Sequence, residues 1–137
     1  MKRDLKFFIR IEKLRKAKKA EKISETELIN ILKEIFEKYK VIKSQKFLIN
    51  EIKKRTNKSL PNIKKIRRII AKLGIKIIYI SRKGNVQENC PVCDSPLFEK
   101  IYFNLKNEKV VEYYCKVCEY KSNDKRDVPI KFKFLRL

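Results

Sequence analysis

The stretch that decides the fold is Cys90-Pro91-Val92-Cys93, together with its counterpart Cys115-Lys116-Val117-Cys118. These two segments hold all four cysteines of the chain, and 21 residues separate the pairs. Each C-x-x-C turn can place two sulfur atoms on one side, and two such turns at the ends of a β-hairpin converge on a tetrahedral site. The gap lies just beyond the usual spacing of a zinc site. We therefore expect one structural zinc ion, with the ligands Cys90, Cys93, Cys115 and Cys118.

Two alternatives use the same cysteines: a single iron ion with the same ligands, and redox or disulfide chemistry. Four thiolate ligands leave no open coordination position, so the site is expected to stabilise a fold and not to catalyse a reaction. The chain has no histidine and only two glycines, which removes the commonest general base and any Gly-rich phosphate loop. We expect that the protein is not an enzyme.

The length of 137 residues predicts one domain or two small ones. Thiolates that hold a metal must stay reduced, which favours a reducing compartment. The short apolar cluster after Met1 does not resemble a signal peptide, and no apolar run approaches the length of a membrane span. We expect a cytoplasmic protein without a membrane partner.

Positive charge is the second strong feature, because 37 Lys and Arg residues stand against 16 Asp and Glu residues and give a net charge of +21. The excess is concentrated in residues 1–83, which carry +19, whereas residues 84–137 carry +2. A chain this basic is expected to bind nucleic acid by neutralising phosphates. A lysine-rich composition bias is the alternative, but residues 60–83 hold eight cations and no acid, whereas residues 25–40 hold more acids than cations.

The N-terminal segment, residues 1–23, is a separate basic unit. Its apolar residues Leu5, Phe8, Ile11 and Leu14 recur at three-residue spacing, which predicts a basic helix, with a disordered arm as the alternative. Candidate nucleic-acid contacts in this segment are Arg15, Lys16, Lys18 and Lys19.

Residues 24–88 have the pattern of a winged helix-turn-helix. Ser24, Ser44 and Ser59 are expected to cap three helices, over about 25–40, 45–56 and 60–73, and Gly74 suits the left-handed position after the third. The β-branched residues 75–81 predict a strand, and residues 86–89 are expected to return beside it after a turn. Three helices followed by a β-hairpin is the order of a winged helix.

Residues 89–137 are predicted to form a zinc ribbon. Residues 97–104 and 109–114 are expected to pair as a hairpin between the cysteine pairs, and the strictly alternating residues 128–134 to add an edge strand. The expected fold class is therefore α+β: a basic N-terminal helix, a winged helix-turn-helix and a C-terminal four-cysteine zinc ribbon.

The third helix is the expected recognition helix, because its outer face is basic. Candidate contacts on this helix are Asn62, Lys64, Lys65, Arg67, Arg68 and Lys72, with Arg82 and Lys83 at the wing tip. A merely solvated surface is the alternative. The ribbon aromatics could stack on bases, although burial in a core is favoured; they are Tyr102, Phe103, Tyr113, Tyr114 and Tyr120.

This order of parts resembles the archaeal transcription factor E family, which is similar to the alpha subunit of eukaryotic TFIIE. The resemblance covers residues 24–137 and rests on the winged-helix order and the four cysteines. It implies a protein that assists promoter opening by docking on RNA polymerase. Asp94 and Glu119 follow the cysteine pairs, where such ribbons usually have glycine, and glutamate adopts a left-handed backbone less readily than aspartate. The ribbon equally resembles those of archaeal ribosomal proteins.

Three hypotheses for function follow. The first is a DNA-binding protein of the transcription machinery or a transcription regulator. The second is an RNA-binding ribosomal or ribosome-associated protein, in which the basic N-terminal segment threads between phosphates. The third is a docking module that uses the nearly neutral ribbon against RNA polymerase or another protein.

Overall fold

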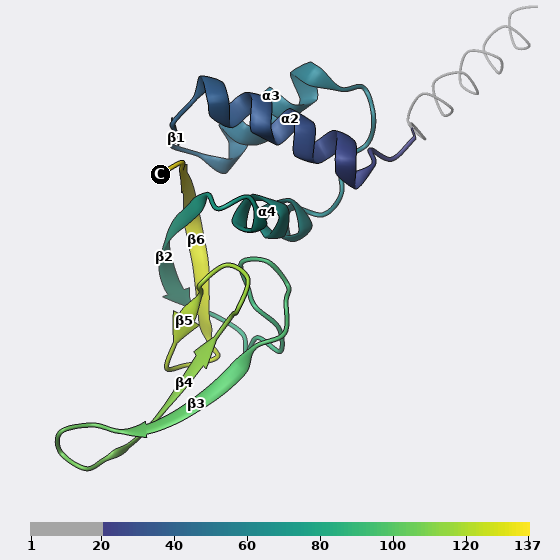
Figure 1. Ribbon diagram of the computed structural model, residues 1–137. Coiled ribbons are helices and arrows are strands. Elements are labelled where there is room, and N and C mark those ends of the chain that lie inside the picture. Colours follow the sequence, from purple (N-terminus) through teal and green to yellow (C-terminus); the bar gives the residue numbers. More distant parts are fainter. Residues whose placement is uncertain (1–20) are drawn as a thin grey trace, which may run out of the picture.

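The computed structural model describes residues 21–137, which form a mixed α+β fold with three helices and two small antiparallel sheets (Figure 1). The predicted basic helix or arm and its candidate contacts Arg15, Lys16, Lys18 and Lys19 lie outside the described residues. Within residues 21–137, no helix is long and apolar enough to cross a lipid bilayer.

Two of the helices begin at the predicted serine caps. They are α2 (Glu25–Lys38) and α3 (Gln45–Arg55), with the short strand β1 (Val41–Ile42) between them. The hydroxyl of Ser24 accepts a hydrogen bond from the Glu27 amide at 3.2 Å, and that of Ser44 accepts one from the Phe47 amide at 3.1 Å. Each serine thus satisfies an amide that has no partner inside its helix, which confirms both predicted caps.

The third helix, α4 (Ile63–Lys72), begins later than expected, because its cap is Asn62 and not Ser59. The Asn62 side chain accepts a hydrogen bond from the Lys64 amide at 2.8 Å. The backbone of Ser59 instead bonds to the segment before α2, donating to Glu21 and accepting from Ile23. The Ser59 carbonyl is thus bonded to Ile23 and does not accept the first hydrogen bond of a helix, as the carbonyl of a cap residue does.

The end of α4 follows the sequence prediction. Gly74 has φ +82°, and its amide donates to the carbonyl of Ala71, while the amide of Ile75 donates to that of Ile70. A glycine adopts this left-handed backbone without steric cost, which confirms its predicted place after the helix.

The first sheet contains a pairing that the sequence analysis predicted wrongly. Its strand order is β1-β6-β2, in which β2 (Lys76–Lys83) pairs antiparallel with β6 (Asp127–Leu135) and not with residues 86–89. The alternating residues of β6, which the sequence predicts as an edge strand of the ribbon, form the central strand of this sheet. The physical reason is burial: Phe134 lies opposite Ile77 and Ile42 and is 0 % exposed, a gain that the short polar stretch 86–89 cannot offer.

The second sheet, with order β3-β4-β5, confirms the predicted hairpin between the cysteine pairs. It contains β3 (Phe98–Phe103), β4 (Lys109–Tyr114) and the two-residue strand β5 (Lys121–Ser122). In Figure 1 the β3–β4 hairpin extends away from the helices. Because β2 pairs with β6, residues 84–126 form a long insertion in the sequence between two neighbouring strands of the first sheet.

The core lies between the three helices and the first sheet. Phe134 of β6 packs edge-on against Phe36 of α2, with ring centroids 6.5 Å apart. The other fully buried side chains of this core come mainly from the helices: Leu28, Leu32, Ile35, Ile42, Leu48, Ile52, Ile66 and Ile70.

Candidate metal centre

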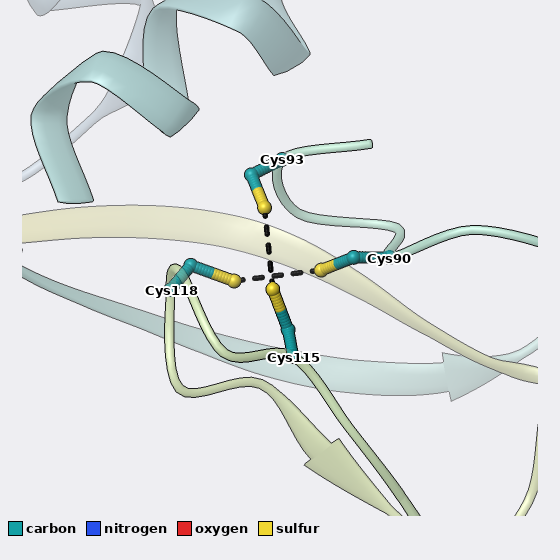
Figure 2. A group of neighbouring side chains, drawn as sticks. All are labelled: Cys90, Cys93, Cys115 and Cys118. Carbon is teal, nitrogen blue, oxygen red and sulfur yellow. Dashed lines mark hydrogen bonds between the residues drawn. The ribbon is translucent and has the colours of Figure 1, made fainter. Parts of the chain in front are cut away.

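The four cysteines converge on one point, as Figure 2 shows, with all four Sγ atoms within 4.8 Å of one another. The Sγ atoms of Cys90 and Cys118 are 3.4 Å apart, and those of Cys93 and Cys115 are 3.5 Å apart. In a tetrahedral tetrathiolate with bonds of about 2.3 Å, sulfur atoms are about 3.8 Å apart. The sulfur cluster is therefore the right size for a metal ion such as zinc, which confirms that the two pairs form one site.

The two C-x-x-C turns share two backbone features. The Cys90 amide donates to the Ser95 carbonyl at 2.8 Å, and the Cys115 amide donates to the Tyr120 carbonyl at 2.9 Å. The residue after each pair has a left-handed backbone, with φ +62° at Asp94 and +66° at Glu119. Both residues thus take the conformation that glycine adopts more easily.

The four thiol groups lie close together in a largely buried position. Cys90, Cys93 and Cys115 are buried, and contact with the sulfur atoms of Cys90 and Cys93, together with burial, holds the pKa of Cys118 far above its usual range. Four thiolates cannot exist together in this space without a cation, because their charges repel one another. A divalent metal removes that penalty. The amide of Val117 also donates to Sγ of Cys115 at 3.3 Å.

Arg67 lies beside this cluster, which corrects the expectation that it contacts nucleic acid. Only 4 % of Arg67 is exposed. Its Nε donates to the Val92 carbonyl at 2.6 Å, and its Nη1 donates to Oε1 of Gln45 at 2.6 Å. The sequence predicts Arg67 among the basic residues of this helix, and nothing in it indicates that the first cysteine turn covers this side chain.

The rest of α4 presents a basic face. Lys65 and Lys72 are exposed, Lys64 is half-buried, and Arg68 is half-buried with Nε donating to the Cys93 carbonyl at 3.0 Å. Residues 65, 68 and 72 share one face of a helix because of their spacing. The exposed Asn62 uses its side-chain oxygen as the cap described above.

The two candidates near the end of β2 differ in their surroundings. Arg82 is exposed. Lys83 forms salt bridges with Asp127 at 2.6 Å and Asp124 at 3.1 Å, and the hydrogen bonds to these carboxylates raise its pKa. Lys83 therefore ties the end of β2 to the start of β6 and to the loop before it, and it does not lie at the tip of a tight turn.

The hairpin aromatics divide between core and surface. Tyr120 is buried, and its hydroxyl donates to the Asp127 carbonyl at 2.9 Å. Tyr113 and Tyr114 on β4 are half-buried. On β3 every residue is exposed, Phe103 by 65 %, and the turn beyond it presents a fully exposed Leu105.

We compared the chain with protein-family models, with curated proteins and with solved structures, and none of them matches.

Proposed function

We propose that this protein is a non-enzymatic nucleic-acid-binding protein with a structural zinc ion, and that it binds DNA in transcription. The observation that carries the proposal is the basic face of α4, where Lys65 and Lys72 are exposed beside Arg68 in a chain of net charge +21. Exposed cations on a helix that follows a helix-turn unit suit the phosphates and base edges of a major groove.

We infer a winged helix from the order of elements. A helix, a short strand and two further helices precede two long antiparallel strands, β2 and β6. In this interpretation α3 and α4 form the helix-turn-helix, and the segment between the strands, residues 84–126, occupies the position of the wing. The metal centre and the β3–β4 hairpin are then an enlarged wing, and not a separate domain after a finished one.

Zinc is the metal that this donor set favours. Four thiolates in tetrahedral arrangement select zinc or an iron–sulfur site, and a closed site leaves no position for a substrate. Cys90, Cys93, Cys115 and Cys118 would hold the ion. When bound, it would supply folding free energy to the two turns, which have little apolar core of their own.

Salt-dependent binding to duplex DNA tests the proposal. Each phosphate contact contributes a slope of about −0.9 to log K against log salt concentration, so Lys65→Ala with Lys72→Ala should make the slope shallower by about 2. Both side chains are exposed, so the double variant should fold normally. The matched control is Lys100→Ala with Lys106→Ala on the hairpin, which removes the same charge elsewhere. Equal slopes for both double variants would count against α4 as the contact surface.

RNA is the alternative ligand, as in a ribosomal or ribosome-associated protein. Competition of duplex DNA, duplex RNA and single-stranded RNA for the wild type separates these cases. Tighter binding to RNA, together with co-sedimentation with a ribosomal subunit at high salt, would replace DNA by RNA in the proposal.

A second candidate function is docking on a protein such as RNA polymerase through the β3–β4 hairpin. Apolar side chains are exposed along this hairpin and its turn, including Ile101, Phe103 and Leu105. Large apolar side chains gathered on a projecting element are typical of interaction sites. Partner capture that resists nuclease and is lost in Leu105→Asp would support this function, whereas capture that disappears with nuclease would not.

A further inference from the structure

The guanidinium group of Arg67 is buried without a carboxylate beside it. Among residues 21–137, the salt bridges of the structure do not include Arg67. Its hydrogen bonds go to neutral acceptors, the carbonyls of Val92 and Pro91 and the side chain of Gln45. Its Cζ lies 4.0 Å from the ring centroid of Phe132. A buried cation needs a counter-charge, since removal from water is costly.

The sulfur cluster supplies that charge when it holds a divalent metal. Four thiolates and one such ion carry a net charge of −2. Burial, the larger effect, lowers the pKa of Arg67, and negative charge at Cys90, Cys93 and Cys118 opposes this shift. Arg67 also donates to carbonyls within the first cysteine turn itself, so its charge and its hydrogen bonds act on the same loop.

Arg68 extends this link to the surface. Its Nε donates to the Cys93 carbonyl at 3.0 Å, so two consecutive arginines of α4 bond to three consecutive carbonyls of the first cysteine turn. Arg68 is only half-buried and lies on the same face as Lys65 and Lys72. The first cysteine turn therefore orients a cation of the basic face.

We propose that Arg67 is the counter-cation of the metal centre and that, with Arg68, it couples metal binding to nucleic-acid binding by α4. The second half of this inference rests on the proposed function. Closure of the turn by the metal presents its carbonyls to both arginines and fixes α4 against the site. Because coupling is reciprocal, DNA bound to α4 should tighten metal binding by the same factor by which metal tightens DNA binding.

The first experiment measures Zn²⁺ affinity of the full chain by competition with a chromophoric chelator. Arg67→Met should weaken Zn²⁺ binding by about 10–100-fold, the usual effect of losing a group that supports metal ligands. Arg67→Lys keeps the charge but not the forked hydrogen bonds, so its Zn²⁺ affinity should lie between those of the wild type and Arg67→Met. The control is Lys65→Met, which removes an exposed charge from the same helix and should leave the affinity within about twofold. Equal Zn²⁺ affinities for Arg67→Met and Lys65→Met would refute the claim that Arg67 is the counter-cation.

Folding of the variants is checked separately. Tetrahedral Co²⁺ absorption and the helical circular dichroism of the loaded protein show whether the site and the helices form. If Arg67→Met does not fold, the Zn²⁺ affinities of Arg67→Lys and Gln45→Ala test the proposal instead. Gln45→Ala removes only the side chain that accepts the hydrogen bond from Nη1 of Arg67. Both should weaken Zn²⁺ binding more than Lys65→Met does, and failure to do so would reject the proposal.

The second experiment repeats the chelator competition with saturating duplex DNA. DNA should increase the Zn²⁺ affinity of the wild type, and this increase should be smaller in Arg67→Met. DNA that binds without changing the Zn²⁺ affinity would refute the coupling but not the proposed function. Absence of DNA binding would refute both the coupling and the proposed function. The first experiment would still test whether Arg67 is the counter-cation of the metal centre.

Discussion

Replacement of Phe134 by alanine tests whether the C-terminal strand belongs to the helical part of the molecule. Phe134 is 0 % exposed, lies opposite Ile77 and Ile42 in the first sheet and packs against Phe36 of α2. Truncation of a buried phenylalanine costs about 3–5 kcal/mol of unfolding free energy. An edge-on aromatic pair contributes about 0.5–1.5 kcal/mol beyond its buried area. We therefore expect Phe134→Ala to lower the unfolding free energy by about 4–5 kcal/mol.

The assay is urea unfolding of the full chain, followed by the far-ultraviolet circular dichroism of the helices. Phe103→Ala is the matched control, since the same side chain is removed from the hairpin, where it is 65 % exposed, and it should cost less than about 0.5 kcal/mol. If the helices unfold in Phe134→Ala at the same urea concentration as in the wild type, β6 does not contribute to their core. The strand order described above would then be wrong.

Three further predictions concern local features. Glu119→Gly should stabilise the metal-loaded protein by about 1 kcal/mol, because glutamate at φ +66° has a backbone strain that glycine lacks, and Asp94→Gly should stabilise it less. Chemical denaturation measures both changes, and a loss of stability in Glu119→Gly would show that the glutamate backbone is not strained. Hydrogen bonds from Arg55 and then Lys54 lower the pKa of Glu51. The stabilising effect of ionised Glu51 is therefore complete above the ordinary glutamate pKa of 4.5 and is lost as the pH falls below it. The stability of Glu51→Gln, measured from about pH 6 to 3, should depend less steeply on pH than that of the wild type, and parallel curves would contradict this. Leu105→Asp should change the unfolding free energy by less than about 0.5 kcal/mol, since the side chain is fully exposed, and a larger loss would show that this turn packs against the body.

Features that depend on neighbours in the sequence could be predicted well. Ser24 and Ser44 cap their helices, and Gly74 ends α4, because a few adjacent residues determine each of these. The convergence of the four cysteines was predictable for the same reason, since two C-x-x-C turns joined by a hairpin have few other ways to arrange their sulfur atoms.

Features that depend on contacts between distant parts of the sequence could not be predicted. Residues 127–135 alternate as a strand should, but alternation does not identify the partner, and β2 lies far away in the sequence. The sequence predicts nucleic-acid contact for Arg67 because it belongs to a basic helix, and for Asn62 because asparagine near a helix start pairs well with adenine. In the fold Arg67 is covered by a turn that follows it by 25 residues, whereas Asn62 caps the helix and remains exposed.

The most direct test of the central claim, that the metal centre and α4 form one unit, is the nuclear magnetic resonance spectrum of the Arg67 and Arg68 Nε–H groups during metal removal by a chelator. Both donate to carbonyls of the first cysteine turn, at 2.6 and 3.0 Å. We expect both signals to shift or disappear together with those of the cysteine turns, and the α4 amides to shift with them. Disappearance of the turn signals while Arg67, Arg68 and the α4 amides stay unchanged would contradict the claim.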